Sequence, residues 1–315
     1  MTRRKRSFEN QLINIFWGLT KGSRLLKPYS NRFKEMGFKI VVFEQQFFTT
    51  QNRRVTPDMV VESVELEECI LAEWTQEREI SDRKREQLCK LVNIDEGSLR
   101  DSVSEACVRN KDVILIITLH SEESFKRFIK NSDLPIILLV YHYPSDYLLE
   151  KKFNHFSVDE TEHFFNQRLK FRKIPYSFPD INLSNLSESL IVDKVIWTLT
   201  IILVKKEEGF EFNIEYFVKR MLTESFYDLL SERKRREIIR ASKDIINELL
   251  RRRYGIGILE RIRPDPPTWR VILPQQEKFR KIRLIERRFQ RFINEITGRP
   301  VQPSLFNNFN QGGES

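Results

Sequence analysis

Long apolar runs are missing from this sequence. The most apolar stretch runs from Leu190 to Val204, is 15 residues long and contains Asp193 and Lys194. A membrane-spanning helix needs about 20 predominantly apolar residues, so this stretch predicts a buried helix. The basic N-terminus has no apolar segment behind it, as a secretory signal would have. We therefore expect a cytoplasmic protein with no membrane partner.

Several common site patterns are missing as well. The three cysteines, Cys69, Cys89 and Cys107, contain no CxxC pair and are odd in number, which predicts reduced thiols. The four histidines form neither HxxxH nor HExxH, so a zinc site is disfavoured. Neither GxxxxGK[ST] nor GxGxxG occurs, so we expect no nucleotide partner, and without GxSxG we expect no serine nucleophile elbow.

The composition favours two packed domains. The chain has 315 residues, which is long for a single hydrophobic core. Hydrophobic residues make up 40% of it and 24 residues are Phe, so there is enough apolar material to build such cores.

The positive charge is concentrated near the C-terminus. Residues 233–291 hold 19 Lys and Arg against 7 Asp and Glu, a net of +12 that exceeds the +9 of the whole chain. The rest of the chain is therefore net acidic. Segregation on this scale favours a polyanionic partner, nucleic acid first. A merely soluble surface, an acidic protein or a membrane surface are the alternatives.

The first half has the pattern of an α/β domain. Two continuous apolar strands joined through a helix predict a parallel pair covered on both faces. We expect helices at 8–26, 31–36, 81–92 and 122–130, and strands at 38–48, 58–63, 69–75, 113–119 and 135–141.

Two acids accompany the predicted strands. Asp58 follows Pro57 and opens an apolar run, and Glu73 interrupts another apolar run 15 residues later. Two short strands joined by the turn 63–68 would make these acids cross-strand neighbours. The acids of 62–68 have a simpler reading as a solvated turn. Glu73 does not, because an unpaired buried carboxylate is costly.

The segment Pro57-Asp58 with Glu73-Trp74-Thr75, in the order helix, three strands, helix, strand, helix, strand, resembles the PD-(D/E)xK nuclease superfamily. The resemblance implies a restriction-endonuclease-like mixed sheet, with Mg²⁺ held by Asp58 and Glu73. It also implies a third catalytic acid from the first helix. Glu9 is the best match, and Glu35 and Glu44 are weaker ones.

The family's lysine, two residues after the second acid, is absent. Thr75 stands in its place and carries no charge. Members of the superfamily relocate motif residues, so a nearby basic residue could take its role. The candidates are Arg53, Arg54, Arg78 and Lys84.

The second half changes character after the Pro, Ser and Asn residues of 171–185. Helices expected at 187–206, at 214–222 and from Ser231 to the break at Gly255, followed by strands at 257–262 and 268–273, resemble a winged helix, whose third helix enters the major groove. We expect a nuclease-like domain at 1–175, a linker at 176–186, a winged helix at 187–275, a basic amphipathic helix at 276–297 and a flexible tail at 298–315. The expected DNA-binding residues are Arg233, Lys234, Arg236, Arg240, Lys243, Arg251, Arg252, Arg261, Arg263 and Arg270.

Two functions remain open at this stage. The first is a metal-dependent DNA endonuclease of a mobile-element or phage-defence type. Its layout is similar to that of the end-cleaving endonuclease subunit of heteromeric transposons. The second is a catalytically silent, DNA-binding or adaptor subunit of such a complex. Both predict DNA as a partner, together with other proteins of the same system.

Overall fold

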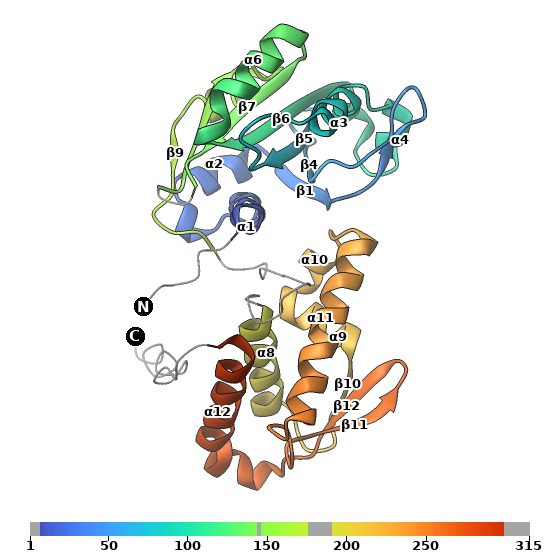
Figure 1. The fold of residues 1–315 in the computed structure, drawn as a ribbon, viewed down its shortest axis with the longest axis vertical. Coiled ribbons are helices and arrows are strands. Elements are labelled where there is room, and N and C mark those ends of the chain that lie inside the picture. Colours follow the sequence, from blue (N-terminus) through green and yellow to red (C-terminus); the bar gives the residue numbers. More distant parts are fainter. Residues whose placement is uncertain (1–6, 144–145, 176–190, 299–315) are drawn as a thin grey trace. The chain divides into compact units, whose positions relative to one another are not determined.

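The computed structural model describes residues 7–143, 146–175 and 191–298, and divides the chain into two compact units (Figure 1). Unit 1 comprises Met1–Phe178 with Leu229–Ser231, and unit 2 comprises Pro179–Asp228 with Glu232–Ser315. The expected linker at 176–186 and the expected tail beyond 298 lie outside the described residues.

Unit 1 is built on a seven-stranded mixed sheet. The strand order is β1-β4-β5-β6-β7-β8-β9. The β5–β6 and β6–β7 pairs are parallel and the others antiparallel, which confirms the predicted parallel pair. The strands are β1 (Phe38–Phe43), β4 (Met59–Ser63), β5 (Glu68–Thr75), β6 (Asn110–Thr118), β7 (Ile136–Tyr141), β8 (Leu148–Phe153) and β9 (Leu169–Lys170).

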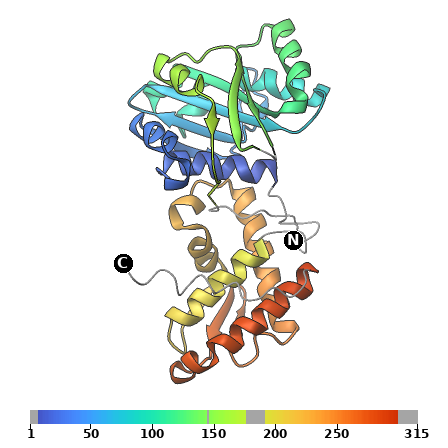
Figure 2. The same cartoon turned by 90° about the vertical axis from the view of Figure 1, so that its left-hand side faces the viewer.

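Helices cover both faces of this sheet (Figures 1 and 2). On one face, Leu88 and Phe125 of two helices pack against Leu115 and Leu138 of the sheet. On the other, the Tyr141 hydroxyl donates to Gln11, and Phe33 stacks on Phe38. The helices are α1 (Phe8–Thr20), α2 (Tyr29–Glu35), α3 (Asp82–Val92), α4 (Glu96–Arg100), α5 (Glu105–Val108), α6 (Glu122–Ser132) and α7 (Asp159–Phe165), with short helices η1 (Arg24–Leu26) and η2 (Leu119–Ser121).

Two predicted elements are shorter than expected. The first helix ends at Thr20, and Gly22 follows with a φ of 69°. The strand predicted at 38–48 breaks at Glu44, whose φ of 51° interrupts the extended backbone. Its second part becomes β2 (Phe47–Phe48), which pairs with β3 (Arg54–Val55). Strands β8 and β9 and helix α7 were not predicted.

Unit 2 contains helices and a small antiparallel sheet of order β10-β12-β11. The predicted hairpin is present, and β10 adds a third strand to it. Trp269 is fully buried and stacks against Phe212. The elements are α8 (Ile191–Lys205), β10 (Glu211–Asn213), α9 (Ile214–Leu222), α10 (Glu224–Tyr227), α11 (Glu232–Arg251), β11 (Leu259–Pro264), β12 (Pro267–Val271) and α12 (Gln275–Thr297).

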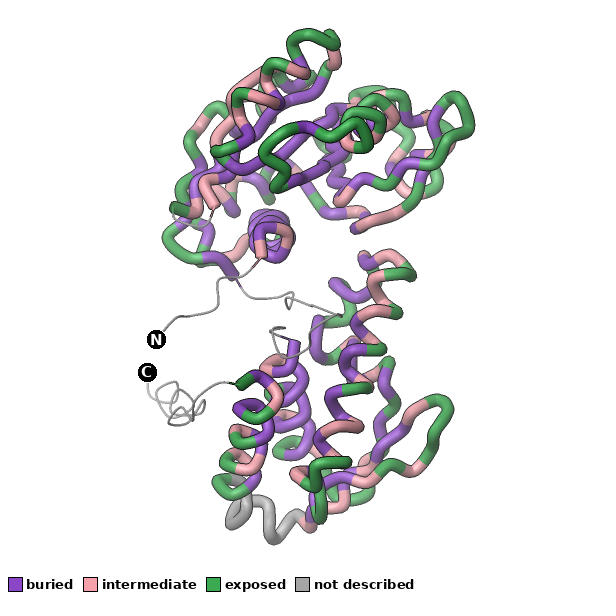
Figure 3. The backbone as a smooth tube through the Cα atoms, in the orientation of Figure 1, coloured by how far each residue is buried: buried purple, intermediate pink, exposed green. Residues whose placement is uncertain are grey.

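Helix α12 packs against α8. Ile285, Phe289 and Ile293 of its predicted apolar stripe are buried. The stripe's other members, Phe279 and Ile282, have side chains outside the described set. Figure 3 shows α8 buried along most of its length, while α11 alternates between buried and exposed positions. Within the described ranges, no helix is long and apolar enough to cross a membrane.

Candidate functional site

Asp58 and Glu73 lie side by side at one end of the β4–β5 hairpin. The register pairs Met59 with Ala72, so Asp58 falls opposite Glu73 at the next step. The Asp58 carboxylate accepts a hydrogen bond from the Trp74 backbone N–H at 2.8 Å. The sequence spacing predicted this neighbourhood correctly, because a short turn fixes the register of the hairpin.

Lys84 reaches the same place from helix α3. The helix begins after Ser81, whose hydroxyl accepts from the Lys84 backbone N–H at 3.3 Å. The Lys84 ammonium lies 2.5 Å from Oε1 of Glu73. The side chains of Lys84 and Glu73 are only 11% and 2% exposed, so solvent screens this ion pair little.

The other three basic candidates do not share this position. Arg53, Arg54 and Arg78 are all exposed. Thr75, in the place of the family's lysine, is buried, and its hydroxyl accepts from the Glu77 backbone N–H at 3.2 Å. Its role in the structure is to cap the end of β5.

Burial dominates the electrostatics of the two acids. It raises the pKa of Asp58 well above its usual value, and the neighbouring charge of Glu73 raises it further. Burial also raises the pKa of Glu73, while the charge of Lys84 and its hydrogen bond oppose that shift. Two carboxylates therefore share one cation in a poorly solvated place, where a second cation would be favourable.

The donor atoms fit a hard metal ion. Oε2 of Glu73 is buried and accepts no hydrogen bond within the described structure. The Glu73 carboxylate is close enough to that of Asp58 for its charge to raise the pKa of Asp58, and carboxylate oxygens are the ligands that Mg²⁺ prefers. No group of three or more Asp, Glu, His or Cys able to hold a metal is present among the described residues. Protein ligands would therefore come from two carboxylates, with water completing the shell.

Glu9 is close enough to influence this site. It lies in the first turn of α1, and its charge contributes to the raised pKa of Asp58. The weaker candidates differ. Glu44 contacts Asp58 through its backbone, since its N–H donates to the Asp58 carbonyl at 3.1 Å, and Glu35 ends α2.

The sequence reasoning missed Gln87. Gln87 opposes the rise in the pKa of Glu73, and its amide donates to the Thr56 carbonyl oxygen at 3.5 Å. Lys84 and Gln87 are three residues apart and so share one side of α3. Buried Leu88 and Leu91 mark the inward side of that helix. The positions of the apolar residues in 81–92 could therefore have indicated that Lys84 and Gln87 lie near the inward side of this helix.

Three of the predicted DNA-binding arginines of α11 are exposed and lie near acids of the same helix. Arg233 pairs with Glu237 at 3.2 Å, and Arg236 pairs with Glu232 at 2.7 Å. Arg240 lies 4.0 Å from Asp244. Lys234 and Lys243 are half-buried.

The remaining predicted basic residues lie at the end of α11 and on the hairpin. Arg251 and Arg252 both pair with Glu248 at 2.6 Å. Arg270 lies between two acids, 2.7 Å from Glu211 and 3.3 Å from Glu260. The Arg261 guanidinium donates to the Pro264 carbonyl, and Arg263 is exposed.

Comparison with protein-family models, with curated proteins and with solved structures finds no match to this chain.

Proposed function

We propose that the chain is a metal-dependent DNA endonuclease whose site is formed by Asp58, Glu73 and Lys84. The observation that carries the proposal is the Lys84–Glu73 contact of 2.5 Å beside Asp58. The sequence resemblance requires two carboxylates and a lysine, and the sequence alone lacks the lysine at its expected place. Helix α3 brings a lysine, Lys84, to Glu73, although it lies eleven residues further along the chain.

Each residue has a distinct role in this proposal. Asp58 and Glu73 would hold Mg²⁺, with Glu9 as an outlying acid. The ion, when bound, would polarise the scissile phosphate and lower the pKa of an attacking water. The Trp74 backbone N–H fixes the Asp58 carboxylate. Lys84 opposes protonation of Glu73 and supplies a charged donor for an oxygen of the phosphate.

Unit 2 supplies the DNA contact in this proposal. Its order of helix, strand, two helices, the long helix α11 and a hairpin supports a winged-helix assignment. The basic excess of 233–291 supports a polyanionic partner. A nuclease-like unit with a DNA-binding unit suits a mobile-element or phage-defence system, in which other proteins of the same system would complete the complex.

A second function is favoured by the fact that Glu73 already has a counter-ion. Lys84 already neutralises Glu73, and both side chains are almost fully buried. Among the described residues no third metal ligand joins them. In this alternative the pair is a structural ion pair, and the chain is a silent DNA-binding or adaptor subunit.

Cleavage of supercoiled plasmid with Mg²⁺ or Mn²⁺ tests the two functions. Asp58→Asn, Glu73→Gln and Lys84→Met should each lower the rate by at least about 100-fold. Glu68→Gln is the matched control, because Glu68 is also a buried glutamate of β5. Cleavage that survives both acid substitutions rules out this site. Absence of cleavage by the unaltered protein, with tight and salt-sensitive DNA binding, supports the adaptor.

A further inference from the structure

Helix α12 carries arginines that differ from those of α11 in one respect. Arg283, Arg287 and Arg291 are exposed, and among the described residues no ion pair joins them to an acid; the charge of Arg283 only opposes the rise in the pKa of Glu286. They follow one another at intervals of four residues, so each lies about 6 Å further along the axis and about 40° further around it than the last. The three guanidinium groups therefore form one ridge, which we call the α12 ridge.

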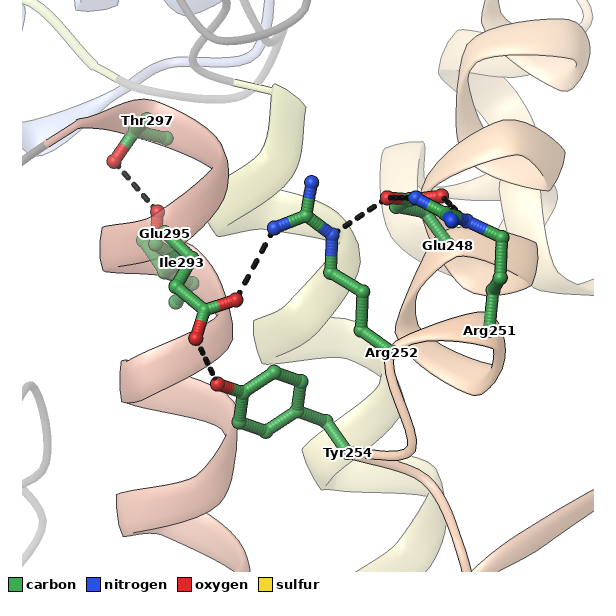
Figure 4. Close-up of polar contacts among 7 residues, drawn as sticks. All are labelled: Glu248, Arg251, Arg252, Tyr254, Ile293, Glu295 and Thr297. Atoms are coloured by element: carbon green, nitrogen blue, oxygen red, sulfur yellow. Dashed lines mark hydrogen bonds and ion pairs between the residues drawn. The ribbon is translucent and has the colours of Figure 1, made fainter.

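The acid best placed to neutralise this ridge is engaged elsewhere. Glu295 lies one turn beyond Arg291, but its carboxylate accepts from Arg252 at 3.1 Å and from the Tyr254 hydroxyl (Figure 4). Arg252 itself bridges Glu295 and Glu248. The segment just after α11 thus engages the carboxylate of Glu295, which forms no ion pair with Arg291 within the described structure.

The opposite side of α12 is already covered. Phe289 and Ile293 are 1% exposed and Phe292 is fully buried, on the side of the helix that packs on α8. A helix that binds a bilayer inserts an apolar face among the lipids, and over residues 283–297 the exposed large apolar side chain of α12 is a single one, Leu284. The ridge therefore suits a ligand that binds chiefly through charge.

We propose that the α12 ridge is the main phosphate-backbone contact of this protein, with nucleic acid as its ligand. The inference rests on the proposed function for its DNA partner and changes where the contact is made. Guanidinium groups bind phosphate oxygens through paired hydrogen bonds. On α11 the predicted arginines must leave an acid of their own helix to do so. On α12 no described ion pair holds the three arginines, and the acid whose charge is near the ridge is Glu286, beside Arg283.

Two triple variants test this proposal in the full chain. The first is Arg283→Gln, Arg287→Gln, Arg291→Gln. The second, Arg233→Gln, Arg236→Gln, Arg240→Gln, removes the same charge from exposed positions of α11. Binding to a labelled DNA duplex is measured from about 50 to 200 mM salt, over which phosphate contacts dominate the change. Circular dichroism and thermal unfolding confirm that both variants fold.

The plot of the logarithm of the binding constant against the logarithm of the salt concentration has a negative slope. The α12 triple should make this slope less steep by about 2.7, since each lost phosphate contact removes about 0.9. The α11 triple should lower it by less than about 1. An equal or larger effect of the α11 triple overturns the proposal while leaving DNA binding intact. Failure of the unaltered protein to bind DNA at low salt overturns the DNA partner as well. Binding to phosphatidylserine vesicles, lost in the α12 triple, would then identify a membrane ligand instead.

Discussion

Strand β5 has a buried glutamate near each end, and the fold treats these two carboxyl groups differently. Glu73 is 2% exposed and is paired with the ammonium of Lys84. Glu68 is fully buried and accepts a hydrogen bond from the Thr161 hydroxyl at 2.5 Å, with no lysine or arginine among its described ion pairs. A lysine supports the charge of the first carboxylate, and a proton removes the charge of the second.

The neighbours of Glu68 explain that difference. Burial raises the pKa of Glu68 to about 8, and the charges of Asp112 and Glu160 add to the shift, against the hydrogen bond from Thr161. Asp112 accepts from the Ser157 backbone N–H at 2.8 Å and from its hydroxyl at 2.7 Å. A protonated Glu68 can donate to Asp112, so the pair needs no cation. The metal ion that we propose would therefore bind at the Glu73 end, where Lys84 opposes protonation of the carboxylate.

The largest expected effect is on the pH dependence of stability. The pKa of Glu68 is raised from 4.5 to about 8 in the folded state, so its folded form favours the proton. The contribution of Glu68 to the free energy of unfolding is therefore fully present below pH 4.5. It is lost as the pH rises to about 8 and beyond, by up to about 5 kcal/mol. Urea unfolding at several pH values measures this loss. Glu68→Gln should be more stable than the unaltered protein at pH 8 and should differ little from it at pH 4; a constant difference would refute the buried proton.

Lys84→Met should destabilise the protein by about 3 kcal/mol at pH 7, because it leaves Glu73 buried without its counter-ion. Urea unfolding again provides the measurement. Lys90→Met is the control on the same helix, since Lys90 pairs with the exposed Glu86 at 2.8 Å. That substitution should cost less than about 1 kcal/mol. Adding Glu73→Gln to Lys84→Met should recover much of the loss, and no recovery would mean that the ion pair is not the cause.

Asp58→Asn should stabilise the metal-free protein at pH 7 by about 1 kcal/mol, while it abolishes cleavage. Burial and the Glu73 charge raise the pKa of Asp58, so its ionised form opposes folding above its unfolded pKa. Thermal unfolding in EDTA measures the change. A destabilised variant would show that the bond from the Trp74 N–H outweighs the cost of the charge.

Mg²⁺ should raise stability only through the Glu73 end of β5. At a concentration ten times Kd, one bound ion stabilises the folded state by about 1.4 kcal/mol. Differential scanning calorimetry with and without Mg²⁺ should show this shift in the unaltered protein and in Glu68→Gln, and not in Glu73→Gln. An identical shift in both variants would place the ion elsewhere.

The sequence predicted the hairpin of the site and its turn, but not the burial of two acids that flank the turn. Alternating strands and a short connection were enough to place Asp58 beside Glu73. The acids of 62–68 had a simple reading as solvated, and that reading is wrong for two of them. Glu62 is 3% exposed and pairs with Lys39 at 3.0 Å, and Glu68 is buried against α7. Their partners lie on distant segments, which no local pattern identifies.

In the basic half of the chain, too, the sequence indicates the ion pairs within one helix but not those between distant segments. Acids four residues from Arg233 and Arg236 could be read from the sequence, because helical spacing fixes such pairs. The capture of Glu295 by Arg252 could not, since it joins residues 43 positions apart. Charge counts therefore located the basic region correctly, while the packing of α11 and α12 decided which arginines remain unpaired.

By itself the sequence determined the α/β class, the parallel pair of strands, the neighbourhood of Asp58 and Glu73, and the basic excess of 233–291. These depend on periodicity and short-range spacing, which the chain carries in its local order. Only the tertiary structure decided that Lys84 pairs with Glu73, that Glu68 is buried beside Asp112, and that no acid of the described residues forms an ion pair with the α12 ridge. Each of these is an electrostatic pairing across elements, and its strength depends on burial and distance that exist only once the chain has folded.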